Sequence, residues 1–150
     1  MKPALTLLIA SLTLSPFAAQ AAVGPVTYIP SPPRQGMVAP PFSTAVKAGD
    51  TLYISGTTDG GATMGGTSAD AAKRVLDNIK RAVEAGGLTM DDLVWVQVFS
   101  SNLADYGAFN EVYRTYFKGP LPARAYLGVD HLLGEAKFEV MGIAVRQGRK

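Results

Sequence analysis

Residues 67–100 read TSADAAKRVLDNIKRAVEAGGLTMDDLVWVQVFS, and they set the architecture because a strong helix signal runs directly into a strand signal. Thr67 and Asp70 match a capping box, in which each side chain bonds the other residue's backbone N–H. The apolar residues that follow recur at helical spacing: Ala72, Val75, Leu76, Ile79, Ala82 and Val83. Gly86 is expected to end the helix in a left-handed conformation. Residues 93–100 are rich in β-branched and aromatic side chains, which predicts a buried strand.

Upstream of this helix, the sequence predicts a hairpin and an extended lead-in. Residues 42–56 contain two β-rich runs around Gly49, which can supply the positive φ of a tight turn. Residues 22–41 hold six of the ten prolines, so they predict an extended segment with one short edge strand. Residues 59–66, DGGATMGG, predict a flexible connection, because no Gly-Lys-Ser/Thr follows to make a phosphate-binding loop.

Downstream, the pattern predicts a second helix and two more strands. Asp105 is expected to cap a helix over residues 106–117. Its aromatic residues recur at helical spacing and predict core packing: Tyr106, Phe109, Tyr113, Tyr116 and Phe117. Residues 124–129 and 138–145 predict strands. The resulting order, β-β-α-β-α-β-β after the lead-in, favours an α+β fold with a mixed β-sheet and two helices packed on one face. A chain of this size leaves the other face bare, so we expect self-association to cover it.

Length and composition narrow the class of protein. The chain has 150 residues, 47% of them apolar, which suits a single domain. A net charge of +2 argues against a nucleic-acid partner or a polybasic membrane anchor. The absence of cysteine excludes disulfides, thiolate zinc sites and a cysteine nucleophile.

The first 21 residues predict a cleavable signal peptide. Lys2 precedes an apolar stretch over residues 4–14, and Ala19 and Ala21 form a cleavage site. The alternative is an uncleaved membrane anchor, but the apolar stretch is shorter than the roughly 20 residues that a spanning helix needs. The mature protein is therefore expected to be periplasmic or secreted, with no membrane contact after cleavage.

Several segments resemble the RidA/YjgF family of reactive-intermediate deaminases. They run in the family's order from residue 42 to residue 145 and comprise LYISG, AAKRVLDNIKRAVEAGGLTMDDLVWVQVF, LADYGAFNEVYRTYF, PARAYLGV and FEVMGIAV. The resemblance implies a chorismate-mutase-like, RidA-type domain over residues 42–150 that assembles as a homotrimeric barrel with ligand clefts between neighbouring subunits. It also implies hydrolytic deamination of small enamine and imine acids, derived from 2-aminoacrylate, to 2-oxo acids and ammonia. No metal or organic cofactor is expected.

Arg124 is the anchor that the resemblance implies for the carboxylate of a small imino or oxo acid. It stands in the family's Pro-x-Arg motif, and its planar fork of donors matches two carboxylate oxygens. Backbone groups around Ala125 and Tyr126 are expected to add contacts. The alternative is an arginine at a strand end that pairs with an acid of a neighbouring subunit or reaches solvent.

Four further positions match polar or cleft-lining places of the family pattern. Ser55 and Gly56 correspond to the cleft floor, although Ser55 can instead bond its own backbone and Gly56 can simply begin a loop. Asn110 matches a polar position, with a bond across the subunit contact as the alternative. Phe42 stands where related proteins place a tyrosine, so a hydroxyl is missing.

The last strand departs from the family at its acid–base group. Imine hydrolysis needs a group that passes protons, and the family pattern is Glu-x-Glu-Ala-x-Ala-Val, with the second glutamate catalytic. Aligned from its end, FEVMGIAV puts Glu139 at the first acidic position and Met141 at the second. A thioether cannot carry a proton at neutral pH.

Four interpretations of Met141 remain open. The enzyme works through an ordered water alone, or Glu139 takes over from the same strand face, about 6.5–7 Å away. A third interpretation is a non-catalytic carboxylate-binding protein. The fourth is a periplasmic holdase chaperone, which would expose a contiguous apolar patch.

Overall fold

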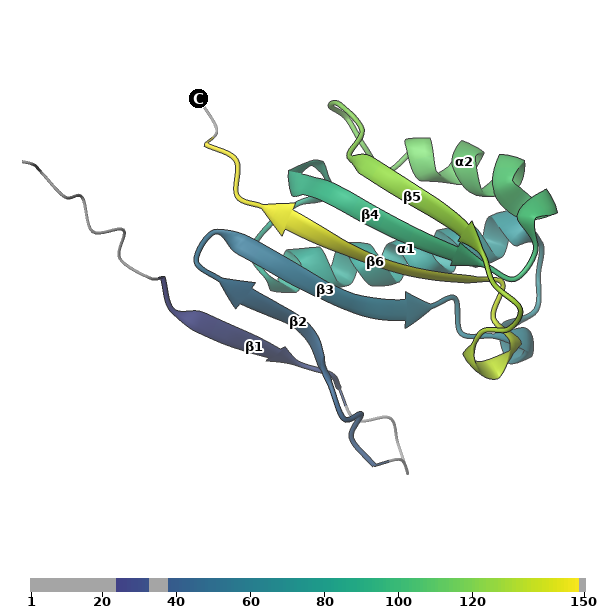
Figure 1. Ribbon diagram of the computed structural model, residues 1–150, viewed down its shortest axis with the longest axis horizontal. Coiled ribbons are helices and arrows are strands. Elements are labelled where there is room, and N and C mark those ends of the chain that lie inside the picture. Colours follow the sequence, from purple (N-terminus) through teal and green to yellow (C-terminus); the bar gives the residue numbers. More distant parts are fainter. Residues whose placement is uncertain (1–23, 33–37, 149–150) are drawn as a thin grey trace, which may run out of the picture.

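The computed structural model describes residues 24–32 and 38–148, so the predicted signal peptide lies outside the described residues (Figure 1). Its strands are β1 (Val26–Pro30), β2 (Ser43–Ala48), β3 (Thr51–Thr58), β4 (Leu93–Ser100), β5 (Ala123–Gly128) and β6 (Phe138–Val145), and its α-helices are α1 (Ser68–Ala85) and α2 (Tyr106–Arg114). The strands form one six-stranded sheet in the order β1-β2-β3-β6-β4-β5. Only β4 and β5 pair in parallel, so the sheet is mixed, as predicted.

Both helices cover the same face of the sheet (Figure 1), which confirms the predicted layers. The predicted apolar stripe of α1 is buried: Ala72, Val75, Leu76, Ile79, Ala82 and Val83 are each at most 4% exposed. It packs against strand residues that alternate toward the helices: Leu52, Ile54, Val96, Val98, Phe138, Val140 and Ala144. Neither helix in the described part of the chain is long and apolar enough to cross a membrane.

The start of α1 is built as the sequence predicts. The Asp70 backbone N–H donates to Thr67 Oγ1 at 3.2 Å, and the Thr67 backbone N–H donates to Asp70 Oδ2 at 2.8 Å. These bonds to Thr67 lower the pKa of the Asp70 carboxyl, so the cap keeps its negative charge at the positive end of the helix dipole.

The end of α1 differs from the prediction at Gly86. This residue is right-handed, with φ −78°, and Gly87 adopts the left-handed conformation instead, with φ 73°. Gly86 still donates its N–H to the carbonyl of Ala82, so the helical geometry continues through it. A side chain on Gly86 would collide with Leu52 of β3. Glycine is therefore required at position 86 for close packing and at position 87 for the turn.

The predicted cap of α2 is also wrong. A short 3₁₀ turn precedes this helix, and Asn102 caps the turn with its side-chain oxygen. Asp105 makes no capping bond; its Oδ1 accepts a hydrogen bond from Ser68 Oγ at 2.7 Å and so joins the starts of the two helices. The helix ends before Tyr116 and Phe117, which still pack against the core from the following segment.

The glycine-rich connection between β3 and α1 is ordered rather than flexible. Asp59 is 3% exposed, and its carboxylate accepts backbone N–H groups of Gly61, Lys137 and Phe138 at 2.8, 2.8 and 3.0 Å. Arg74 of α1 donates to the backbone carbonyl of Asp59 at 3.0 Å. A buried charge satisfied by several N–H groups fixes the connection against the start of β6.

The helix-free face carries an apolar row that crosses all six strands. Pairing registers align Tyr28, Val46, Tyr53, Ile143, Trp95 and Ala123, which we call the open row. Tyr28 is 68% exposed, Tyr53 51% and Trp95 38%. The chain supplies no second layer over this face in its described part, so the open row is uncovered in a single copy.

Candidate functional site

Arg124 is the second residue of β5, an edge strand, and its side chain lies on the helix side of the sheet. In the parallel register with β4, Arg124 pairs with Val96 and Tyr126 pairs with Val98. Because Val96 and Val98 belong to the core, Arg124 and Tyr126 point beneath α2 rather than into solvent.

The Arg124 guanidinium sits among aromatic rings. Its Cζ lies 4.6 Å from the ring centroid of Tyr113, 5.6 Å from Tyr126, 5.8 Å from Tyr106 and 5.9 Å from Phe109. We call these four rings the aromatic box. Ring faces at these distances attract a cation, and more strongly where water is excluded.

Within the described part of the chain, the guanidinium has one polar partner and no counter-ion. Arg124 Nη2 donates to Asn110 Oδ1 at 2.7 Å, so the predicted Arg124 and Asn110 are brought together within one subunit. None of the ion pairs among residues 24–32 and 38–148 includes Arg124. Arg124 is half-buried, and a charged side chain that is largely withdrawn from water is normally paired. Arg124 therefore keeps charge and donor capacity for an acceptor from outside the subunit.

Buried polar atoms without a hydrogen-bond partner concentrate around this arginine. Among the described residues they are Arg124 Nη1, Tyr113 Oη, Tyr126 Oη and Asp105 Oδ2, which we call the unpaired cluster. Burial raises the pKa of Tyr113 to about 12 and also raises the pKa of Tyr126. Both phenols are therefore neutral donors at physiological pH. Native proteins leave few buried polar atoms unpaired, so the unpaired donors Arg124 Nη1 and Tyr113 Oη, on side chains that lie side by side, mark a candidate anion site.

A second group of predicted residues lies at the bulge between β3 and β6. The register shifts between Ile54 and Thr57, which leaves Ser55 and Gly56 in the irregular part. A side chain on Gly56 would collide with the Glu139 carboxylate, so these two residues are in close approach.

The bulge is linked to the start of β2 by a hydroxyl. Ser55 Oγ donates to the backbone carbonyl of Ser43 at 2.8 Å, rather than to its own backbone. Phe42 precedes Ser43 and is 56% exposed. We call Phe42, Ser55, Gly56 and Glu139 the bulge group.

Met141 lies on the helix-free face and is 38% exposed. It pairs with Gln97 of β4, which in turn pairs with Ala125 of β5, so these side chains share that face. Glu139 is two residues before Met141 and lies on the same face, as predicted. Arg124 points to the opposite face. One subunit therefore keeps the arginine and Glu139 on opposite sides of the sheet.

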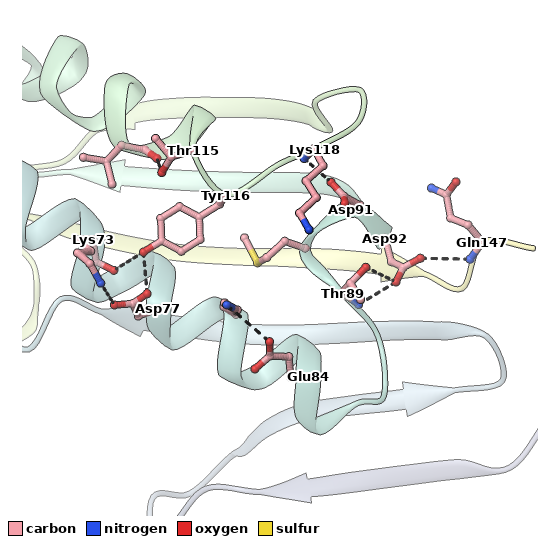
Figure 2. Close-up of a pocket in the computed structure, with 13 residues that line it drawn as sticks. Lys73, Asp77, Glu84, Thr89, Asp91, Asp92, Thr115, Tyr116, Lys118 and Gln147 are labelled. Atoms are coloured by element: carbon pink, nitrogen blue, oxygen red, sulfur yellow. Dashed lines mark hydrogen bonds and ion pairs between the residues drawn. The ribbon is translucent and has the colours of Figure 1, made fainter. Parts of the chain in front are cut away.

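The described cavities lie away from Arg124. One of about 800 Å³ separates α1 from the segment after α2 (Figure 2), where the Tyr116 hydroxyl donates to Asp77 Oδ1 at 2.7 Å. Another, of about 660 Å³, is lined by the loop around His131 and by Glu139. No group of three or more acidic or histidine side chains in residues 24–32 and 38–148 is placed to hold a metal ion.

Sequence reasoning assigned some residues of this region only a structural role. The aromatic stripe of α2 is part of the core, since Phe109 and Tyr113 are at most 3% exposed, yet it also encloses Arg124. Asp105 was expected only as a helix cap. The sequence did contain a clue, namely an arginine in one element and regularly spaced aromatic residues in another. The clue can be used only when it is known that α2 packs against β5.

Comparisons with known proteins agree on one family. The family model described as "Endoribonuclease L-PSP" matches residues 35–146. A "2-iminobutanoate/2-iminopropanoate deaminase" of Dermatophagoides farinae is 37% identical over 109 residues, which are 70% of this chain and 85% of the relative. The mouse protein of the same name is 36% identical over 110 residues, covering 71% and 82% of the two chains.

Solved structures show the same arrangement. The E. coli YjgF gene product is 33% identical, with a TM-score of 0.66 over 71% of this chain and 89% of that chain. E. coli TdcF, solved with bound serine, is 28% identical, with a TM-score of 0.71 over 81% of this chain and 100% of that chain.

Proposed function

The chain belongs to the RidA/YjgF family, and on that premise we propose that it hydrolyses small enamine and imine acids, derived from 2-aminoacrylate, to 2-oxo acids and ammonia. The observation that carries this proposal is the Arg124 guanidinium, which is held by Asn110 and the aromatic box and has no counter-ion among the described residues. The names of the mite and mouse relatives support the reaction class. Serine bound to TdcF supports a ligand with a small amino-acid skeleton.

The anchoring step follows from the chemistry of the guanidinium. A carboxylate can accept two parallel N–H bonds from an arginine, which fixes both its position and its plane. Arg124 Nη1 is unpaired but buried, so a ligand reaches it only after a small rotation of the side chain or of a box ring. Tyr106 is the exposed member of the box, at 49%, and is the ring that can move with the least loss of packing.

We propose a homotrimer in which clefts form between subunits. Two features support this assembly: the open row needs an apolar cover, and Arg124 and the bulge group lie on opposite faces of one subunit. A neighbouring copy that brought its bulge group to the β5 edge would set Glu139 across from Arg124. Sedimentation velocity of the mature protein tests the stoichiometry, and a monomer at micromolar concentration contradicts it.

A second candidate function is non-catalytic binding of small carboxylates. Met141 favours it, because this side chain cannot transfer a proton where the family's pattern has a glutamate. The exposed open row is also the kind of surface that a holdase would use. In a trimer that buries this row, however, the surface is no longer accessible to an unfolded chain.

Decay of enzymatically generated 2-iminopropanoate separates these candidates. We expect catalysed decay with the wild-type protein, loss of that catalysis in Arg124→Ala, and a faster reaction in Met141→Glu. Calorimetry with a 2-oxo acid reports binding separately. Binding without catalysis supports the second candidate, and the absence of both contradicts the carboxylate site altogether.

We also propose that the protein is exported and processed after Ala21. Lys2, the apolar stretch and the Ala-Gln-Ala site support this. Intact mass of the protein recovered from periplasmic and culture fractions is the test. A full-length chain retained in the cytoplasm contradicts it.

A further inference from the structure

We propose that Asp105 is the proton acceptor of the Arg124 site and supplies there the carboxylate that position 141 lacks. The inference rests on the proposed deaminase function and adds a residue to it. Asp105 lies at the start of α2, on the same side of the sheet as Arg124, whereas Glu139 faces the other side.

One oxygen of the Asp105 carboxylate accepts a hydrogen bond, and the other accepts none. Oδ1 accepts the hydroxyl of Ser68 at 2.7 Å, while Oδ2 is buried and has no partner. The side chain makes no capping bond to its own helix. A buried carboxylate oxygen without a hydrogen bond lowers stability, so a stability role alone does not account for this geometry.

The residues on either side of Asp105 in the sequence contact the strand that carries Arg124. The turn that contains Asp105 packs on the end of β5, where a Cβ on Gly128 would lie 3.0 Å from Leu103. The neighbouring Tyr106 ring meets the Tyr126 ring edge-on at 4.9 Å. The Tyr126 ring in turn lies 5.6 Å from the Arg124 guanidinium carbon.

The electrostatics agree with this proximity. Burial is the main cause that raises the pKa of Tyr126, and an interaction with the Ser100 side chain lowers it; of the smaller effects, the charge of Asp105 raises this pKa and Arg124 lowers it. The Tyr126 phenol therefore lies within electrostatic range of the cation and of the carboxylate. Its hydroxyl also interacts with the Ser100 side chain, and it can bridge a ligand or water bonded to Arg124 and the free oxygen of Asp105.

The proposed chemistry begins with an iminium acid whose carboxylate is bound by Arg124. Asp105 takes a proton from water as the water oxygen bonds to the imine carbon, and the C=N π electrons move to nitrogen, giving a carbinolamine. The proton on Asp105 then passes to the amino nitrogen. As the C–N bond breaks, the hydroxyl loses its proton to Asp105 and becomes the carbonyl. Ammonia takes that proton, so iminium and water give a 2-oxo acid and ammonium.

The decisive experiment measures kcat and KM for 2-iminopropanoate hydrolysis by the full-length chain over a range of pH. Loss of a general base typically lowers rates by roughly 10²–10⁴-fold, so we expect Asp105→Asn to lower kcat about 100-fold or more with KM changed less than threefold. We also expect the acid limb of the kcat profile to flatten in this variant. A purely structural defect would leave the shape of that profile unchanged.

Ser68→Ala is the matched control, because it removes the partner of Oδ1 and leaves Oδ2 in place. It should lower kcat less than Asp105→Asn does, and it should keep the acid limb of the kcat profile, if Oδ2 carries the chemistry. If Ser68→Ala and Asp105→Asn lower kcat equally, the proposal is overturned, and Asp105 serves only to connect the starts of the two helices. Glu139→Gln tests the competing carboxylate; a large loss there together with an active Asp105→Asn also overturns it.

The failure of the proposed function is distinguishable from the failure of this inference. A wild-type protein without activity overturns both, whereas an active wild type with an unaffected Asp105→Asn overturns only the role of Asp105. Should Asp105→Asn not fold, Tyr126→Phe probes the same proton path, because it removes only the hydroxyl. We expect it to lower kcat about tenfold, and an unchanged kcat contradicts the path.

Discussion

Replacing Asp59 by asparagine should strongly destabilise the protein. The Asp59 carboxylate is 3% exposed and accepts three backbone N–H groups, one from its own connection and two from the start of β6. Asparagine is nearly isosteric, but it presents one oxygen and one NH₂ group. If the oxygen keeps the two bonds to Lys137 and Phe138, the NH₂ group faces the N–H of Gly61, and two donors oppose each other.

The magnitude follows from the bonds that change. A hydrogen bond to a charged group contributes about 1.5–3 kcal/mol, and a neutral one about half of that. Asp59→Asn loses one charged bond, about 2 kcal/mol, and weakens two others by about 1 kcal/mol each. The free energy of unfolding should fall by about 4 kcal/mol, which at a typical slope moves a urea midpoint by roughly 1–4 M.

Urea unfolding followed by circular dichroism measures this change at one protein concentration, because an oligomer's stability depends on concentration. Asp91→Asn is the matched control: Asp91 also accepts two backbone N–H groups, from Lys118 and Gly119 at 2.9 and 3.3 Å, but it is exposed. We expect its loss to stay below about 1 kcal/mol. Equal midpoints for the two variants would refute the view that burial makes the Asp59 bonds strong.

The remaining predictions concern the helix cap, a buried phenol and the anchor. Thr67→Ala should lower the free energy of unfolding by about 1 kcal/mol, measured by thermal unfolding, because it removes one half of the capping box. Tyr113 has its pKa raised from 10.0 to about 12, so the protein should lose stability as the pH rises from 10 to 12, and Tyr113→Phe should reduce that loss without destabilising the protein at pH 7. A pH-independent difference between the two proteins would contradict this. Arg124→Lys should raise KM for 2-iminopropanoate about tenfold or more despite the retained charge, because an ammonium lacks the planar fork. An unchanged KM would count against bidentate anchoring.

The parts of the fold that sequence alone predicts are those set by local signals. The capping box at Thr67 and the apolar stripe of α1 are encoded within one helix, and the alternation in β6 is encoded within one strand. Gly86 shows where local signals no longer suffice: two adjacent glycines both suit a helix end. The left-handed one is Gly87, while Gly86 packs against Leu52 of β3, a contact that the local sequence does not show.

The candidate site is less predictable because it depends on contacts between distant elements. Arg124 was identified by its motif, but its aromatic box comes from α2 and from β5, and no spacing along the chain shows that these elements meet. Asp105 was expected to cap the helix, but its side chain makes no capping bond, and Asn102 caps the 3₁₀ turn that precedes the helix. Arg124 and Glu139 are separated because side chains alternate between the two faces along a strand, and the pairing of the strands places these two residues on opposite faces. That pairing depends on the strand order of the whole sheet.

The position of β5 at the edge of the sheet has a dynamic consequence. This strand is bonded to one neighbour only, β4, so its backbone opens at a lower free energy than the central strands do. A ligand bound by Arg124 would stabilise this edge strand against local opening, because it would link the strand to α2. Binding would then slow amide hydrogen exchange along β5 more than anywhere else in the sheet, so that the ligand orders the strand that binds it.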